Sequence, residues 1–109
     1  MTRVDIFRDK LGNIAKFECN GHSGYADEGS DIVCSAISVL TQSAVMGLID
    51  VAKIPVEYSV EDGSLSCNLP KLNEEDRKKA DMILETMLLG LRSIQEDYHG
   101  YLKITEREV

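Results

Sequence analysis

The hydrophobic residues of this chain follow two periods, and each period predicts one kind of secondary structure. Apolar and polar residues alternate over residues 2–8, 14–20, 56–60, 65–69 and 101–105, which is the period of a half-buried strand. An Asp-Gly pair between the third and fourth segments is a strong signal for a two-residue hairpin turn. The apolar positions of the first four segments are Val4, Ile6, Ala15, Phe17, Cys19, Val56, Tyr58, Val60, Leu65, Cys67 and Leu69.

Two longer segments repeat their apolar residues every three or four positions, which is the period of a helix. We expect the first helix to begin at a cap on Ser30 or Asp31 and to last to about Ala52. The second is expected to start after a cap at Asn73 and to end near Asp97. The first helix is apolar on more than one side, so a sheet should cover one side and a second helix or a second subunit another. This pattern favours a homodimer.

The predicted order is strand, strand, helix, strand, strand, helix, strand. Two strand–strand–helix units and a closing strand predict an α/β fold of the α+β kind, in which two long helices lie on one face of one sheet as a two-layer sandwich. The length of 109 residues fits a single domain over residues 1–109. The charged tail at residues 106–109 is expected to fray.

The net charge limits the kinds of partner that the protein is expected to bind, and the cysteine content indicates the compartment in which it is expected to work. The formal net charge of −7 opposes direct binding to nucleic acid; it either suits a basic protein partner or only keeps the protein in solution. Three cysteines without a CxxC pair do not form an even disulfide framework. Because the first ten residues lack the apolar run of a signal peptide, we expect a reduced, cytoplasmic protein. Polar residues interrupt the longest apolar stretch, 32–52, which indicates a buried helix rather than a membrane span.

One stretch carries the candidate chemistry, GHSGYADEGSDIVCSA at residues 21–36. It places His22 on a glycine-rich loop and Cys34 in the first turn of the predicted helix. A helix N-terminus favours negative charge and an imidazole can take a thiol proton, so the two residues could form a nucleophilic pair. From the residue pattern alone an inert loop histidine is the favoured interpretation, because such pairs are common by chance. A zinc site from Cys19, His22, Cys34 and Cys67 is less favoured, since Cys19 and Cys67 fall on the core sides of their strands.

The longer motif GHSGYADEGSDIVCSAIS, at residues 21–38, strongly resembles the signature of the bacterial ribosomal-processing cysteine protease Prp family. That signature has a Gly-His pair, a glycine-containing loop, Asp-Ile-Val-Cys and then small residues, and the similarity extends over the whole chain. Members of the family remove an N-terminal extension from large-subunit ribosomal protein number twenty-seven. The resemblance implies the same substrate, a homodimer, no cofactor, and a catalytic dyad at His22 and Cys34. Ser23 stands where the family is expected to have alanine, and Ser35 where it prefers a small residue.

The implied mechanism assigns expected roles to further residues. His22 takes the thiol proton, Cys34 attacks the scissile carbonyl to form an acyl-enzyme, and water completes hydrolysis. The backbone amides of Cys34 and Ser35 are candidate oxyanion donors. Asp31 either orients His22 or only caps the helix. The substrate is expected to lie under a loop that includes Gly21, Ser23, Gly24 and Gly29.

Two further functions compete with proteolysis. The first is a protein that binds a ribosomal partner without cutting it. The second is a redox-sensing thiol at Cys34, which would form a sulfenic acid but hydrolyse nothing.

Overall fold

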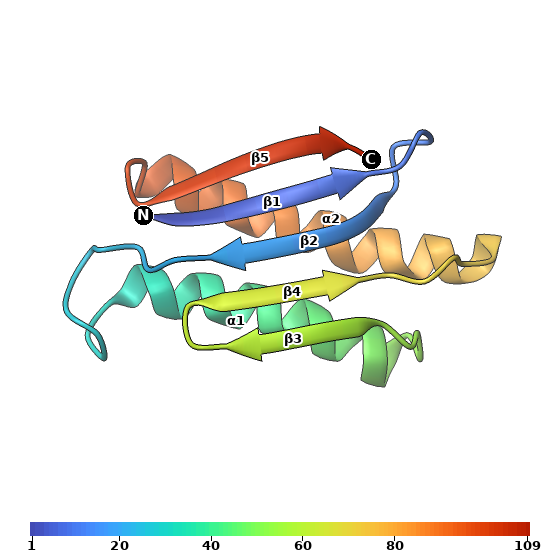
Figure 1. Ribbon diagram of the computed structural model, residues 1–109, viewed down its shortest axis with the longest axis horizontal. Helices are drawn as coiled ribbons and strands as arrows, with labels where there is room; N and C mark the ends of the chain where they lie inside the picture. The colour runs from blue at the N-terminus through green and yellow to red at the C-terminus, as the bar shows by residue number, and fades with distance from the viewer.

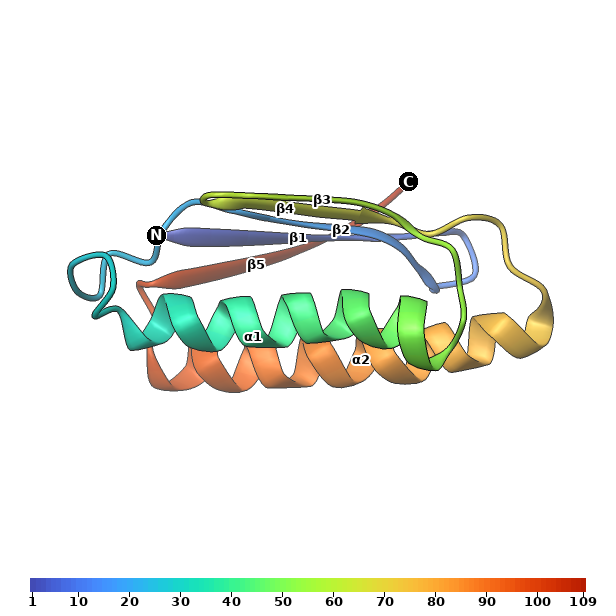
Figure 2. The same cartoon turned by 90° about the horizontal axis from the view of Figure 1, so that it is seen from below.

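The computed structural model describes all 109 residues as one five-stranded sheet with both long helices packed on the same face (Figures 1 and 2). This is the two-layer α+β sandwich that the sequence predicts. A single π-helical turn, η1 (Gly47–Val51), extends the first helix to about the predicted length. The elements in chain order are β1 (Thr2–Arg8), β2 (Ile14–Asn20), α1 (Ile32–Met46), η1, β3 (Glu57–Glu61), β4 (Ser64–Asn68), α2 (Glu74–Asp97) and β5 (Leu102–Glu108).

The strand order decides which segments meet. The order across the sheet is β3-β4-β2-β1-β5, in which β1 and β5 are parallel and the other neighbours antiparallel. Because β4 pairs with β2, Ser64 lies opposite Asn20. The β3–β4 turn, the loop that follows β2 and the start of α1 therefore lie at the same end of the molecule (Figure 1).

The core lies between the sheet and the two helices. It contains the predicted strand residues Val4, Ile6, Phe17 and Cys67, all with no exposed surface. Burial of this apolar surface is the main force that holds the two layers together. The remaining core residues are Ile14, Val33, Ile37, Ala44, Val45, Leu48, Ala52, Ile54, Leu65, Ala80, Leu84, Met87, Leu88, Leu91 and Leu102.

The first helix packs on the sheet with one side and on α2 with another. The contact between the helices is close, since a Cβ added at Gly90 would lie 2.9 Å from Leu40 Cδ1. By length and composition alone, α1 with η1 is apolar enough to cross a membrane, but its buried stripe forms part of the protein core. A second apolar stripe on α1, made of Ile32, Val39 and Met46, is more than half exposed.

The C-terminal segment differs from the prediction. Residues 106–109 were expected to fray, but β5 continues to Glu108 and lies parallel to β1, with Glu108 opposite Arg8. Arg8 also contacts Glu106 at 2.7 Å and Glu85 at 2.9 Å, which joins β1, β5 and α2. The hydrogen bond from Arg8 lowers the pKa of Glu106. Pairing with β1 and the contact with Arg8 therefore order residues 106–109, although their charged sequence alone predicts fraying.

Candidate active site

Asp31 sets the position of Cys34 at the start of α1. Its Oδ1 accepts hydrogen bonds from the backbone amides of Val33 at 3.0 Å and Cys34 at 2.9 Å. These are amides that a helix start otherwise leaves without partners, so Asp31 is the N-cap, one of the two predicted positions. Cys34 is then the third helical residue, and its side chain is half-buried beside the helix N-terminus.

The second oxygen of Asp31 binds the loop that follows β2. Oδ2 accepts from Ser23 Oγ at 2.5 Å, from the Tyr25 amide at 3.0 Å and from the Ala26 amide at 3.3 Å. Burial by itself would raise the pKa of Asp31, but the hydrogen bond from Ser23 and those from the backbone amides outweigh it and hold the pKa well below its ordinary range. Asp31 is therefore a charged, 6% exposed anchor between the loop and the helix, and it makes no contact with His22.

An aromatic contact holds the middle of the same loop. The Tyr25 ring packs edge-on against Tyr98 and Tyr101, with centroids 5.4 and 5.3 Å apart. These partners lie at the end of α2 and in the segment before β5, so the loop is attached both to α1 through Asp31 and to the opposite helix. The loop glycines Gly21, Gly24 and Gly29 all have positive φ, a conformation that glycine adopts without steric cost.

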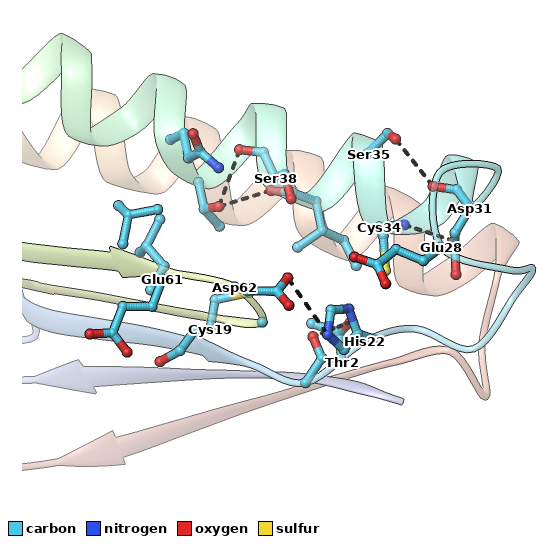
Figure 3. A pocket seen from close by; sticks show the side chains of 18 of the residues that line it. Thr2, Cys19, His22, Glu28, Asp31, Cys34, Ser35, Ser38, Glu61 and Asp62 are labelled. Atoms are coloured by element: carbon cyan, nitrogen blue, oxygen red, sulfur yellow. Dashed lines mark hydrogen bonds and ion pairs between the residues drawn. The ribbon is translucent and has the colours of Figure 1, made fainter.

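The loop lies directly against the thiol of Cys34. The Ser23 amide donates a hydrogen bond to Cys34 Sγ at 3.1 Å. His22 immediately precedes Ser23 in the chain, so the imidazole belongs to the same short segment as the group that contacts the sulfur. His22 and Cys34 line one cleft (Figure 3), although no hydrogen bond joins them in this structure.

The imidazole of His22 lies over the β3–β4 turn. Its side chain is 58% exposed, and Nε2 is 4.0 Å from Oδ1 of Asp62. A Cβ added at the neighbouring Gly63 would lie 2.9 Å from the same nitrogen. The sequence identified Asp62 and Gly63 only as a hairpin turn, because it carries no signal that this turn adjoins the residues after β2.

The cleft has a volume of about 780 Å³ and runs between the loop, the first half of α1 and the β3–β4 hairpin. Four carboxylates line it, from Glu28, Asp31, Glu61 and Asp62, and no lysine or arginine does. Its walls combine small and polar groups with a few apolar ones, which suits an extended peptide backbone with mixed side chains. The other lining residues are Thr2, Cys19, Gly21, His22, Gly24, Ala26, Gly29, Cys34, Ser35, Ile37, Ser38, Thr41, Gln42, Val60, Gly63, Ser64 and Leu65.

Comparison with known proteins identifies the family. The family model described as Cysteine protease Prp matches residues 1–103. The chain belongs to the Prp family of cysteine proteases. The ribosomal processing cysteine protease Prp of Bacillus subtilis strain 168 is 30% identical over 108 residues, which cover 96% of each chain. Its counterpart from Staphylococcus aureus strain Mu50 is 25% identical over 104 residues, 95% of this chain and 97% of the relative.

Solved Prp structures share the fold. The S. aureus Prp bound to a covalently linked product peptide superposes with a TM-score of 0.89 at 26% identity, covering 97% of this chain and 99% of that one. The S. aureus Prp bound to a substrate peptide has a TM-score of 0.82 at 24% identity, with the same coverage. The whole chain thus has the architecture of a Prp protease.

The backbone amides that were predicted as oxyanion donors already have partners. The Cys34 amide donates to Asp31 Oδ1 at 2.9 Å, and the Ser35 amide donates to the Asp31 carbonyl at 3.1 Å. An oxyanion would have to compete with a helix cap and a helical hydrogen bond for these two amides, and their role as oxyanion donors stays a prediction. The amide that contacts the sulfur is that of Ser23, which the sequence places in the substrate loop at a position where the family is expected to have alanine.

The other two cysteines have the surroundings of core residues. Cys67 is fully buried in β4, and Cys19 is half-buried in β2, where it lines the cleft. Burial raises the pKa of Cys19 to about 11 and that of Cys67 to about 12. No group of three or more metal-ligating side chains is arranged to hold a metal ion. His99, at the far end of α2, is exposed and lies outside the cleft.

Proposed function

We propose that this protein is a ribosomal-processing endopeptidase that removes the N-terminal extension of large-subunit ribosomal protein number twenty-seven. Its membership of the Prp family supports this substrate, as do relatives from B. subtilis and S. aureus that are named ribosomal processing cysteine proteases. The two S. aureus Prp structures hold peptides, one a substrate and the other a covalently linked product. A peptide is accordingly the ligand that we expect in the cleft of this chain.

The observation that carries the proposal is the 3.1 Å contact between the Ser23 amide and Cys34 Sγ. It brings the residue next to His22 onto the one half-buried cysteine at a helix N-terminus, within a cleft large enough for a peptide. Partial positive charge at a helix start and an N–H donor both stabilise negative charge on sulfur. These are the surroundings of a nucleophilic cysteine rather than of a structural one.

The reaction follows from these groups. His22 accepts the proton of the Cys34 thiol, and the sulfur attacks the scissile carbonyl carbon to form a tetrahedral intermediate. Collapse of this intermediate breaks the C–N bond, and the imidazolium gives its proton to the leaving amine. Water then attacks the thioester while His22 takes up a proton from it, and the released sulfur is reprotonated. Each step uses only Cys34, His22 and water.

The charge of the cleft supports a basic substrate segment. Glu28, Glu61 and Asp62 line the cleft without a lysine or arginine beside them, and the whole chain has a net charge of −7. Complementary charge accelerates encounter and discourages acidic competitors. We expect cleavage to slow as salt concentration rises, because dissolved ions screen the attraction between exposed carboxylates of the cleft and basic side chains of the substrate.

Mass spectrometry tests the proposed activity. The folded protein, under reducing conditions, is incubated with ribosomal proteins that carry their N-terminal extensions, and each product mass is measured. We expect one ribosomal protein to lose its extension with the wild type and none with Cys34→Ala or His22→Ala. Cys67→Ala, which removes a thiol outside the cleft, serves as the matched control and should still cleave.

The same experiment separates proteolysis from binding alone. If Cys34→Ala retains affinity for the extension peptide but does not cleave it, the cysteine acts as nucleophile. If the wild type binds the peptide and leaves every mass unchanged, the protein is a binding factor and the protease proposal is wrong. If Cys34 is oxidised to sulfenic acid but no substrate is shortened, it acts as a redox sensor instead.

We further propose that the protein is a homodimer that buries the exposed stripe of α1. Ile32, Val39 and Met46 are 57%, 64% and 60% exposed and lie seven residues apart, along one line of the helix. The family resemblance implies a dimer, and an apolar stripe of this length is a suitable surface for it. Light scattering should give twice the chain mass for the wild type and the single mass for Val39→Glu. Leu89→Glu, at a 72% exposed position of α2, should leave the dimer intact.

A further inference from the structure

The two-residue turn between β3 and β4 contacts the segment that carries His22 at three points. The Gly63 carbonyl accepts a hydrogen bond from the Gly21 amide at 2.8 Å. The Gly63 Cα lies so close to the imidazole that an added Cβ would be 2.9 Å from His22 Nε2. The third is the 4.0 Å approach of Asp62 Oδ1 to that nitrogen. The turn therefore lies against both the backbone before His22 and the imidazole ring itself.

The sheet holds this turn in place independently of the rest of the loop. Asn20, the last residue of β2, is paired with Ser64, the first residue of β4, and the Ser64 hydroxyl donates to Asn20 Oδ1 at 3.0 Å. Gly21 and His22 follow Asn20 directly, so they begin at a fixed distance from the turn. The turn would therefore keep its contacts with His22 even if residues 24–30 moved to admit a substrate.

We infer that this turn positions His22 for proton transfer with Cys34, and that Asp62 is the positioning residue that orients the imidazole (Figure 3). The inference rests on the proposed function, in which His22 is the base. A neutral imidazole can accept a thiol proton only through its unprotonated nitrogen. A carboxylate beside Nε2 favours the tautomer that carries its proton there, and this leaves Nδ1 free to accept from the thiol.

At 4.0 Å the imidazole nitrogen and the Asp62 carboxylate are too far apart for a direct hydrogen bond. The Asp62 and His22 side chains are 83% and 58% exposed, so both can rotate without disturbing the core. Catalytic hydrogen bonds are often long in the absence of substrate and shorten when the substrate fills the site. We expect the carboxylate to accept a direct hydrogen bond from Nε2 once a peptide excludes water from this end of the cleft.

Other charged groups at the cleft do not make this contact. Glu28 comes from the loop and Glu61 from β3, and neither forms an ion pair with His22. Asp31, at the start of α1, already accepts five hydrogen bonds through its side chain. The remaining titratable groups there are the thiols of Cys19 and Cys34, so Asp62 is the carboxylate that contacts the imidazole.

Asp62→Asn tests the inference with little effect on the fold, because asparagine is as acceptable as aspartate in a turn. Glu57→Gln, at the other end of β3 and outside the cleft, is the matched control for loss of one negative charge from the hairpin. With the extension peptide as substrate, we expect Asp62→Asn to lower kcat about tenfold. This loss is smaller than the whole rate contribution of a general base, because the variant keeps His22 and loses only its orientation. We expect Glu57→Gln to match the wild type in kcat.

Nitrogen-15 NMR of the imidazole rings, recorded with the extension peptide bound to a Cys34→Ala form of each protein, gives a readout that is independent of turnover. The chain has two histidines, so His99 supplies an internal reference for the His22 signals. Wild type and Glu57→Gln should show His22 protonated mainly at Nε2 in its neutral form. Asp62→Asn should shift that population toward the Nδ1-protonated form and leave the His99 signals unchanged.

The outcomes separate this inference from the proposed function. If His22→Ala abolishes cleavage but Asp62→Asn keeps both the wild-type kcat and the wild-type tautomer, Asp62 does not position the base and the inference fails alone. A lower kcat without a change of tautomer also overturns it, since the carboxylate would then act on the substrate. If Cys34→Ala or His22→Ala still cleaves, the proposed function itself is wrong. Loss of kcat together with the tautomer shift supports both.

Discussion

The Ser23 amide donates a hydrogen bond to the sulfur of Cys34 at 3.1 Å, and this contact joins the loop that follows β2 to the first turn of α1. The same serine donates its hydroxyl proton to Asp31, the cap of the helix that carries Cys34. Ser23 is only 2% exposed and is not among the residues that line the cleft, so its amide contacts the sulfur from inside the protein. The contact therefore holds the sulfur of Cys34 beside the segment that carries His22.

Alkylation should distinguish the three cysteines. Burial raises the pKa of Cys19 to about 11 and that of Cys67 to about 12, so neither forms much thiolate near neutral pH. We expect iodoacetamide to modify the folded protein only at Cys34, as peptide mapping by mass spectrometry would detect. All three cysteines should react after unfolding in urea. Equal labelling of Cys19 and Cys34 in the folded protein would contradict the assignment of Cys34 as the nucleophile.

Asp31→Asn should loosen the loop while it retains the helix cap. The asparagine carbonyl can still accept from the Val33 and Cys34 amides, but its NH₂ group would face three donors from the loop, including Ser23 Oγ. We expect a lower free energy of unfolding and faster hydrogen exchange at Tyr25 and its neighbours than in the wild type. Unchanged exchange in the loop would mean that Asp31 acts only as a cap.

The pH dependence of stability offers a second test of Asp31. Its pKa is lower in the folded protein than in the unfolded chain, so its stabilising effect is complete above the ordinary carboxyl value of about 4 and is lost as pH falls below it. Urea titrations at pH values between about 5 and 3 should therefore show a steeper loss of stability for the wild type than for Asp31→Asn. Parallel curves would indicate that the Asp31 pKa is not lowered by folding.

Gly21 should tolerate alanine less well than Gly24 does. Both have positive φ, at 90° and 75°, so alanine at either position costs about 1–2 kcal/mol of conformational free energy. At Gly21 the new Cβ would also lie 2.8 Å from the backbone oxygen of Met1, whereas at Gly24 nothing lies within 4 Å. Urea unfolding should show a larger destabilisation for Gly21→Ala than for Gly24→Ala. Equal losses would show that the chain at Met1 shifts freely.

Removal of residues 106–109 should destabilise the fold. The truncation deletes the last paired residues of β5 and the contacts that Glu106 makes with Arg8 and Arg92. We expect a loss of about 1–3 kcal/mol in the free energy of unfolding. Glu106→Gln keeps the strand and removes only the charge, and for a pair that is about one-quarter to one-third exposed we expect a smaller loss of about 0.5–1 kcal/mol. A truncated protein as stable as the wild type would mean that the tail adds nothing to the sheet.

The sequence predicted well those features that depend on residues close together in the chain. Alternation and helical periodicity depend on neighbours within a few positions, so the strands, the helices and the Asp62-Gly63 turn were all identified in order. The caps at Asp31 and Asn73 were predictable for the same reason, because a capping side chain acts on amides two or three residues away. The motif around His22 and Cys34 was enough to indicate the family.

The tertiary structure decided what joins residues that are far apart. Only the pairing of β4 with β2 brings Asp62 to His22, and only the pairing of β5 with β1 gives residues 106–109 an ordered neighbour. It also showed that the Cys34 amide is already bound, because Asp31 uses one oxygen for the helix and the other for the loop. Local pattern fixes which groups are available within a segment. Strand order and register, which depend on the packing of the whole chain, determine which of those groups meet.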